Sequence, residues 1–530
     1  MMRLIFMGML ALAWAGVLCA KPKTLLYCSE GSPSTFNPAL VTDGTTFDAS
    51  SRTVFNRLIE FVPGTTQLQP GLAESWSIED GGKRYVFHLR HHVAFHARGD
   101  FRPSRAFNAD DVLFTFNRMR DKSHPYHQVS GGTYAYFDSM GLNELIKDIS
   151  KRDDHTVAFE LARPEAPFLA DMAMDFASIH SAEYADFLLE RHAPEDLDRL
   201  PVGTGPFMMV QYVPDAMIRY EAFKSYWGSA PAIDRLVFLI TPDAAVRWFK
   251  MQSRECHLMP YPNLAELKAI RNTKGVQLQS APGLNIGYLA FNVTRKPLDN
   301  QKVRLALAMA MDQQAILRAI YHGTAIPAAA AIPPSLWSYD KDLKPYPHDP
   351  KRAQALLAEA GYPHGFTLSL WAMPVQRPYM PDARRAAELI QADWAKIGVK
   401  AHIVSYEWGE YLKRAAQGEH DAMLMGWTGD NGDPDNFLGT LLSCTGVGTA
   451  NNVSRFCNPD YETLIRQGRA EADQARRTAI YTKAQAMLYQ MVPWVPIAYA
   501  QVFMPVRQEV QGYRISPLGY HAFDGVRLEP

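Results

Sequence analysis

The chain after Gly283 alternates short apolar runs with stretches whose apolar residues recur at helical spacing. The expected strands are 286–292, 367–372, 400–404 and 422–425, and the expected helices are 301–311, 349–361, 382–397, 409–417 and 473–488. This alternation indicates an α/β fold with a mixed or parallel sheet covered on both faces. Because such sheets bind ligands beyond the carboxyl ends of their strands, the loops after residues 372 and 425 are candidate sites.

The first part of the chain is less regular. Alternating residues at 84–90 predict a strand of a half-buried hairpin, and Asn108 before an acidic turn predicts a capped helix over 109–121. Apolar residues near helical period predict a further helix over 49–61. The glycine-rich segment 202–207 lacks the Gly-Lys-Ser/Thr ending of a phosphate loop, so we expect a structural turn there.

The first twenty residues differ from the rest of the chain. Arg3 is followed by an apolar run, residues 4–18, and then by Cys19 and Ala20. The run is shorter than the roughly 20 residues that a membrane span needs, so the pattern predicts a secretory signal peptide over 1–20. A lipoprotein signal has a small residue before its cysteine, but here Leu18 precedes Cys19, which argues against lipidation.

Length and charge limit the class of protein. A chain of 530 residues exceeds what one hydrophobic core usually supports, so two or three domains are expected. The 54 Lys and Arg residues balance 55 Asp and Glu residues. Nucleic-acid binding needs a basic surface, so this balance argues against it.

Removal of the signal peptide leaves four cysteines in an exported chain: Cys28, Cys256, Cys444 and Cys457. An even number predicts two disulfides. Cys444 and Cys457 would close a short loop, and Cys28 would then pair with Cys256. Zinc binding is the alternative, but no CxxC spacing occurs, which argues against it.

The loop that follows the expected strand 422–425 is rich in turn-forming and acidic residues. It carries Asp430, Asp433 and Asp435, and Pro434 is expected to deny it a helical continuation. Three interpretations are open: a solvated acidic loop, a ligand site, or a calcium loop. No glutamate stands at the twelfth position of a calcium loop, which weighs against the last.

Five motifs carry a resemblance to a known family. They are Leu26–Pro33, Gly71–Trp76, Asn108–Val112, Trp371–Tyr379 and Gly426–Asp430. With these motifs, and with the placing of its cysteines, the chain resembles the periplasmic dipeptide-binding proteins of bacterial dipeptide ABC transporters. They lie within the peptide, nickel and haem branch of solute-binding proteins. The cysteine match supports the bridges Cys28–Cys256 and Cys444–Cys457.

The resemblance implies an α/β, two-lobe periplasmic binding protein (Venus-flytrap) fold. Lobe one would comprise residues 21–282 and 501–530, with an extra subdomain at about 55–200. Lobe two would comprise 283–500. Two crossing strands would join the lobes, which close over the ligand.

The resemblance also implies the ligand contacts. Asp430 would hold the α-ammonium of a peptide and Arg377 its α-carboxylate. The further implied contacts are Thr42, Tyr379, Trp427, Thr428 and Gly429, with Thr42 contributed by the opposite lobe. Residues 130–134 match the family too and would line the cleft. Asp43 stands where the family has a small residue before the glycine, which affects fine selectivity more than binding.

The implied function is capture of dipeptides in the periplasm and delivery to an inner-membrane ABC transporter permease. The chain would act as a monomer without a cofactor and would not be an enzyme. One alternative is haem carriage, for which histidines such as His91 and His92 are candidates. The other is a secreted peptide hydrolase, but neither Gly-x-Ser-x-Gly nor His-Glu-x-x-His occurs.

Overall fold

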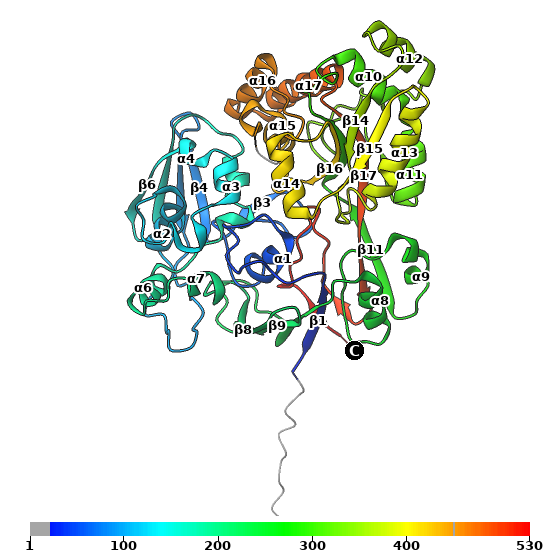
Figure 1. Cartoon of the computed structure of the whole chain (residues 1–530). Helices are drawn as coiled ribbons and strands as arrows, with labels where there is room; N and C mark the ends of the chain where they lie inside the picture. Colours follow the sequence, from blue (N-terminus) through cyan, green and yellow to red (C-terminus); the bar gives the residue numbers. More distant parts are fainter. Residues whose placement is uncertain (1–21, 449–450, 530) are drawn as a thin grey trace, which may run out of the picture.

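The computed structural model of the chain describes residues 22–448 and 451–529, as helices and strands gathered in two large bodies (Figure 1). The signal peptide predicted over 1–20 lies outside the described residues. The α/β prediction is confirmed, since strands and helices alternate along most of the chain. We keep the predicted boundaries as names: lobe one is 22–282 and 501–529, and lobe two is 283–500.

The sheet of lobe two is mixed, as predicted. Its order is β11-β17-β12-β16-β14-β15, with β13 paired to β17; β11 and the second part of β17 belong to lobe one, so the sheet continues across the boundary between the lobes. Strand β14 runs parallel to β15 and β16, whereas β12 is antiparallel to β16 and β17. The strands are β11 (Val276–Pro282), β12 (Asn285–Phe291), β13 (Ala325–Pro327), β14 (Thr367–Trp371), β15 (Lys400–Val404), β16 (Ala422–Thr428) and β17 (Trp494–Arg507).

Helices cover both sides of this sheet, with α11 and α13 on one side and α14 and α15 on the other (Figure 1). Local signals explain where they begin. The Asp349 side chain accepts from the backbone N–H of Arg352, and Pro350 occupies the first turn of the helix. The helices of lobe two are α10 (Gln301–Ala310), α11 (Gln313–Tyr321), α12 (Pro350–Glu359), α13 (Ala383–Ala395), α14 (Trp408–Gln417), α15 (Asp435–Leu442), α16 (Pro459–Ala470) and α17 (Gln474–Met491).

Strand β17 is 14 residues long and pairs with different partners along its length. Its first part, around Ala498, pairs with β12, and its second part, from Gln501 to Arg507, pairs with β11. Beyond it, Tyr513 and Phe523 are buried in the same core as the sheet that contains β1. The last segment of the chain therefore packs into lobe one.

Lobe one contains two separate four-stranded sheets. The first has the order β1-β10-β9-β8 and the second β4-β5-β7-β6. The second sheet contains the predicted hairpin and packs against α2, whose capping box at Asn108 confirms the predicted start. The elements are β1 (Thr24–Ser29), β4 (Ala73–Glu79), β5 (Arg84–Leu89), α2 (Ala109–Arg120), β6 (Ile146–Asp153), β7 (Thr156–Leu161), β8 (Phe207–Val213), β9 (Met217–Ala222) and β10 (Arg235–Ile240).

The helix predicted over 49–61 is wrong. A π-helical turn covers Phe47–Ser51, and Ile59–Phe61 forms strand β2. The carbonyl of Val54 accepts a hydrogen bond from the N–H of Gly205 at 2.7 Å, so the backbone here is satisfied by a distant segment and not by a helix. A Cβ on Gly205 would lie 2.5 Å from the Val54 carbonyl carbon. The glycine-rich segment is thus a structural turn, as predicted.

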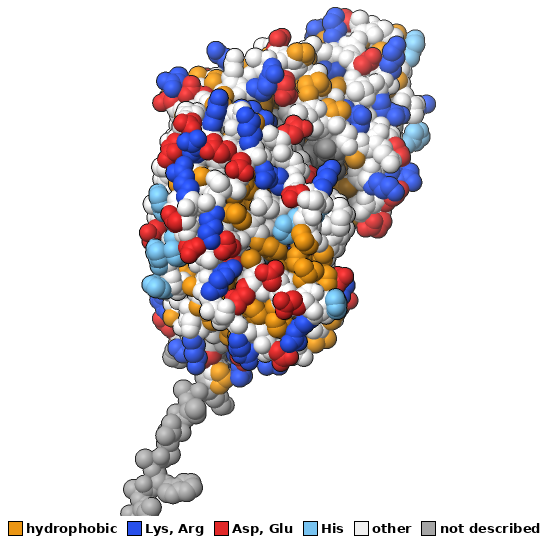
Figure 2. Space-filling view, turned by 90° about the vertical axis from the view of Figure 1, so that its left-hand side faces the viewer, with side chains coloured by type: hydrophobic (Ala, Val, Ile, Leu, Met, Phe, Trp, Pro, Cys, Tyr) orange, Lys and Arg blue, Asp and Glu red, His pale blue; other side chains and the backbone are white. Residues whose placement is uncertain are grey.

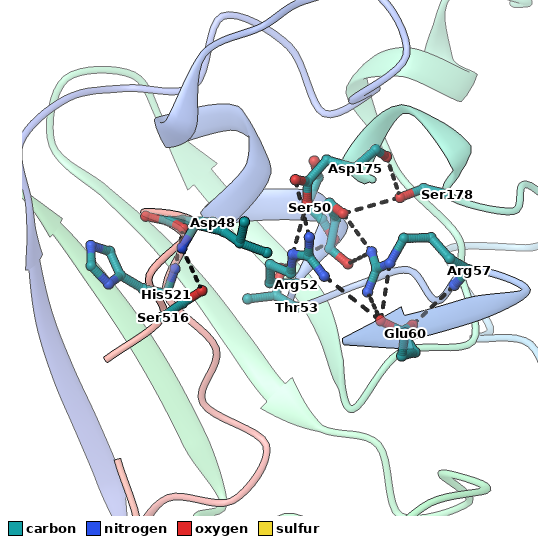
Figure 3. A network of polar contacts seen from close by, with 12 residues as sticks. Asp48, Ser50, Arg52, Thr53, Arg57, Glu60, Asp175, Ser178, Ser516 and His521 are labelled. Carbon is teal, nitrogen blue, oxygen red and sulfur yellow. Dashed lines mark hydrogen bonds and ion pairs between the residues drawn. The ribbon is translucent and has the colours of Figure 1, made fainter. Parts of the chain in front are cut away.

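A buried polar network holds this segment in place (Figure 3). Nε of Arg52 lies 2.8 Å from Oδ1 of Asp175, and Nη1 of Arg52 lies 3.7 Å from Oε2 of Glu60. Its guanidinium stacks over the ring of Tyr520, 3.7 Å from the ring centre. One arginine therefore joins three segments of lobe one, including the C-terminal segment.

Both predicted disulfides, Cys28–Cys256 and Cys444–Cys457, are present. Within residues 22–448 and 451–529, no group of three His, Cys, Asp or Glu side chains could hold a metal ion, and no helix is long and apolar enough to cross a membrane. On the face that Figure 2 shows, acidic and basic side chains are interspersed without a large area of one sign.

Candidate ligand-binding site

The candidate site lies at the end of β16, where the strand continues three residues beyond the predicted end and includes Trp427 and Thr428. Two glycines allow close packing at this point. A Cβ on Gly426 would lie 2.1 Å from Cδ2 of Tyr379, and one on Gly429 would lie 2.6 Å from the ring of Phe437. The motif thus needs glycine because side chains pack directly against its backbone.

The loop after β16 leads directly into α15, which begins at Asp435. The expectation that Pro434 would prevent a following helix is therefore wrong. Pro434 occupies the N-cap position, where the missing N–H group costs nothing because the first N–H groups of a helix have no partner within it.

Asn436, in the first turn of α15, organises the loop. Its side-chain oxygen accepts from the indole Nε1 of Trp427 at 2.9 Å and from the backbone N–H of Asp430 at 3.0 Å. Its side-chain nitrogen donates to Oδ2 of Asp430 at 3.1 Å. One amide therefore fixes both the backbone and the carboxylate of Asp430.

The other oxygen of the Asp430 carboxylate contacts lobe one. The hydroxyl of Tyr136, in α3 (Ala135–Ser139), donates to Oδ1 of Asp430 at 2.7 Å. Burial raises the pKa of Asp430 to about 7, and the negative charge of Asp175 adds to this rise. The hydrogen bonds from Tyr136 and Asn436 act in the opposite direction because they stabilise the carboxylate. Asp430 is thus a half-buried carboxylate at the boundary between the lobes.

Arg377 lies in the loop after β14 and is exposed. Its Nη1 donates to the carbonyl of Gln376 at 3.0 Å, and its guanidinium lies 5.9 Å from the ring centre of Trp408. Burial raises the pKa of Tyr379, and the positive charge of Arg377 opposes that rise. In the described part of the chain, Arg377 forms no salt bridge, so its charge is available to an anion.

Glu30, which follows β1 in lobe one, is an acidic group whose pKa is affected by the charge of Arg377. Burial raises the pKa of Glu30, whereas the positive charges of Arg247 and Arg377 lower it. The charge of Arg377 therefore acts across the boundary between the lobes. Asp430 and Arg377 follow strands β16 and β14, which are neighbours in the sheet, so both side chains lie at one edge of lobe two.

Thr42 is exposed in the loop before α1 (Gly44–Thr46), and no contact joins it to the other candidate residues in the described structure. Asp43 caps this short helix by accepting from the N–H of Thr46. Asp43, the departure from the family pattern, thus has a local structural role.

Asp433 and Asp435 bind arginines of lobe two. Asp433 pairs with Arg477 at 2.8 Å and Asp435 with Arg469 at 2.9 Å, and both aspartates are buried. This pairing contradicts the calcium interpretation, since the carboxylates are already neutralised by cations. It also contradicts the solvated-loop interpretation.

Tyr136, Asn436 and Glu30 were not predicted as site residues. Tyr136 lies two residues beyond segment 130–134, and Glu30 lies inside the quoted motif Leu26–Pro33. For Tyr136 and Glu30, closeness in sequence to a family motif was therefore the signal that could have identified them. Asn436 carried no signal, because its contacts depend on how the loop and α15 fold together.

The family model described as "Bacterial extracellular solute-binding proteins, family 5 Middle" matches residues 67–449. The chain therefore belongs to family 5 of the bacterial extracellular solute-binding proteins. Its fold is the two-lobe α/β fold of periplasmic binding proteins, with a further subdomain in lobe one.

Individual relatives match nearly the whole chain. The dipeptide-binding protein of Escherichia coli K12 is 54% identical over 523 residues, which cover 99% of this chain and 98% of the relative. Heme-binding protein A of Haemophilus influenzae is 47% identical, and the match covers 96% of this chain and 92% of the relative. A crystal structure of the dipeptide-binding protein of Pseudoalteromonas sp. SM9913 with Met-Leu has a TM-score of 0.88 and 40% identity, and the match covers 96% of this chain and 100% of that one.

Proposed function

We propose that this protein captures dipeptides by their charged termini and delivers them to an ABC transporter permease. The observation that carries the proposal is that a half-buried carboxylate, Asp430, and an arginine without a salt bridge among the described residues, Arg377, lie at one edge of lobe two. A zwitterionic peptide complements one fixed anion and one fixed cation. Tyr379, Trp427, Thr428 and Gly429 would line the site between them, and Thr42 would close it from lobe one.

Two fixed charges select ligands by length. Each extended residue adds about 3.3–3.6 Å, so a site that spans two residues leaves one terminus of a tripeptide unpaired. An unpaired charge in a closed cleft costs several kcal/mol, enough for more than about a hundredfold discrimination. Side-chain tolerance would come from water-filled space beside the backbone.

The domain organisation supports a closing cleft. We propose that the lobes divide at Pro282 and Gln501, which are paired where β17 changes its partner from β12 to β11. A ligand that contacts both lobes then favours the closed state, because only contacts made in that state shift the equilibrium toward it. The protein would act without catalysis, in the periplasm, after cleavage of its signal peptide.

Calorimetric titration with single amino acids, dipeptides and tripeptides tests this function. We expect dipeptides with free termini to bind at least about a hundredfold more tightly than amino acids or tripeptides, because only they pair both charges. Equal binding of tripeptides would contradict the length selection. Hydrolysis of a bound dipeptide during the titration would contradict the binding-protein function.

The identity to Heme-binding protein A makes haem carriage the second candidate. An absorbance titration with haemin distinguishes it from peptide capture. A Soret shift that saturates at one equivalent and is abolished by excess dipeptide would place both ligands in one cleft.

The raised pKa of Asp430 predicts a pH dependence of binding. The α-ammonium needs the ionised carboxylate, and burial raises the pKa of this group to about 7 in the ligand-free protein. Dipeptide affinity should therefore fall about tenfold for each pH unit below 7, with proton release on binding. The peptide termini titrate near about 3.5 and 8, outside this window. Calorimetry at pH 5.5, 6.5 and 7.5 measures the effect, and Asp430→Asn should remove most of the slope.

A further inference from the structure

Asn431, the residue after Asp430, reaches across the boundary between the lobes. Its side-chain nitrogen donates to Oδ1 of Asp171 at 2.7 Å, and Asp171 ends helix α5 (Phe168–Asp171) of lobe one. Its side-chain oxygen accepts from the backbone N–H of Asp433 at 2.9 Å. Asn431 and Asp171 are only 3% and 4% exposed. One amide is thus held by lobe two through its oxygen and by lobe one through its nitrogen.

The backbone of the same loop also contacts lobe one. Gly432 has a φ of +73°, and a Cβ there would lie 2.4 Å from Cβ of Thr66. This position therefore needs glycine for both its conformation and its close approach to the opposite lobe.

A second group of contacts extends the boundary. The N–H of Ala166 donates to the carbonyl of Arg469 at 2.6 Å, and the Glu165 carboxylate lies 3.6 Å from Nε of Arg469. Arg469 is held in turn by Asp435, which follows the candidate site by five residues. Segment 165–171 of lobe one therefore meets both the loop 430–436 and helix α16.

We propose that Asp171 and Asn431 form a clasp that holds the lobes together and so positions Asp430 for the peptide. The inference rests on the proposed function and deepens it. The lobes are joined covalently near β11 and β17, whereas Asn431 and Asp171 are joined only by a hydrogen bond between side chains, which is lost when the lobes separate. A contact present only in the closed state adds its free energy to that of ligand binding. Asn431 of the clasp directly follows Asp430 in the chain, so fixing the position of Asn431 also fixes the position of Asp430.

The clasp is a hydrogen bond in which a buried amide donates to a buried carboxyl oxygen. Removal of the acceptor leaves the buried Asn431 amide with only the weak acceptor Sδ of Met174, at 3.8 Å, and this loss costs more than the bond itself contributes. Asp171→Ala removes the acceptor, whereas Asp171→Asn keeps a carbonyl oxygen in its place. Neither substitution alters a residue that would contact the peptide.

The test measures Ala-Ala binding by calorimetry and its dissociation by stopped-flow, in the full mature chain. Asp171→Ala should weaken binding about tenfold, mainly through faster dissociation, and Asp171→Asn should restore most of the affinity. When Asn431→Ala is already present, adding Asp171→Ala should weaken Ala-Ala binding little further, because the hydrogen bond is already absent. The matched control is Asn143→Ala, which removes an Asn–Asp hydrogen bond within lobe one and should leave binding unchanged.

The two proposals fail in different ways. Wild-type affinity and dissociation rate in Asp171→Ala, with normal Ala-Ala binding by the wild type, would overturn the clasp alone. Additive losses in the double variant would also overturn it, since they would show two independent effects. Absence of dipeptide binding by the wild type would overturn the proposed function, and the clasp would fall with it.

Discussion

Asp430→Asn is expected to weaken dipeptide binding by at least tenfold while the fold is retained. A charge-assisted hydrogen bond contributes about 1.5–3 kcal/mol net, and the amide offers the α-ammonium no negative charge. The carboxylate of Asp430 accepts from Tyr136 with one oxygen and from Asn436 with the other. An amide keeps only one acceptor oxygen, so one of these two donors would face the new NH₂ group. The loss should appear in calorimetry while the ligand-free protein still folds.

A peptide with a blocked amine separates the lost charge pair from any general damage. N-acetylated dipeptides lack the ammonium group, so they should bind weakly to the wild type and equally weakly to Asp430→Asn. Asp460→Asn is the matched control, since it removes one negative charge from an exposed position in the first turn of α16. Unchanged affinity for the free dipeptide in Asp430→Asn would remove this carboxylate from the site.

Elements with local signals could be predicted from the sequence. Helix α12 follows a capping aspartate and a first-turn proline, and both signals act within one turn of the chain. The helix predicted over 49–61 failed because its backbone bonds to the distant Gly205, and apolar spacing carries no information about such a partner. The end of β16 failed because cross-strand pairing with Asn285 extends the strand through a glycine and an aromatic residue.

In the candidate site too, local features could be predicted from the sequence and distant contacts could not. Asp430 and Arg377 stand in motifs and could be proposed from the sequence, but their environments could not. Tyr136 is 294 residues from Asp430, and Asp171 is 260 residues from Asn431. Periodicity describes neighbours within about 15 residues, so contacts between lobes are beyond its reach. These contacts determine the burial of Asp430 and hence its raised pKa.

Arg377→Ala is expected to weaken binding of dipeptides with a free carboxylate by at least about tenfold, because the planar guanidinium can hold both carboxylate oxygens. Arg377→Lys should recover only part of this loss, since an ammonium group cannot bind the two oxygens in parallel. Arg377 is exposed and forms no salt bridge among the described residues, so neither change should lower the unfolding temperature appreciably. Calorimetry with Ala-Ala and its C-terminal amide measures the effect.

The amide identifies which end of the peptide Arg377 holds. If the arginine holds the carboxylate, Ala-Ala amide binds wild type and Arg377→Ala with the same low affinity, and the two losses are not additive. Arg384→Ala is the matched control, because it removes an exposed cation from α13 of the same lobe. A further loss of amide binding in Arg377→Ala would show that the arginine contacts another part of the ligand. The separation between Asp430 and Arg377 would then not set peptide length, and selection would have to arise from the walls of the cleft.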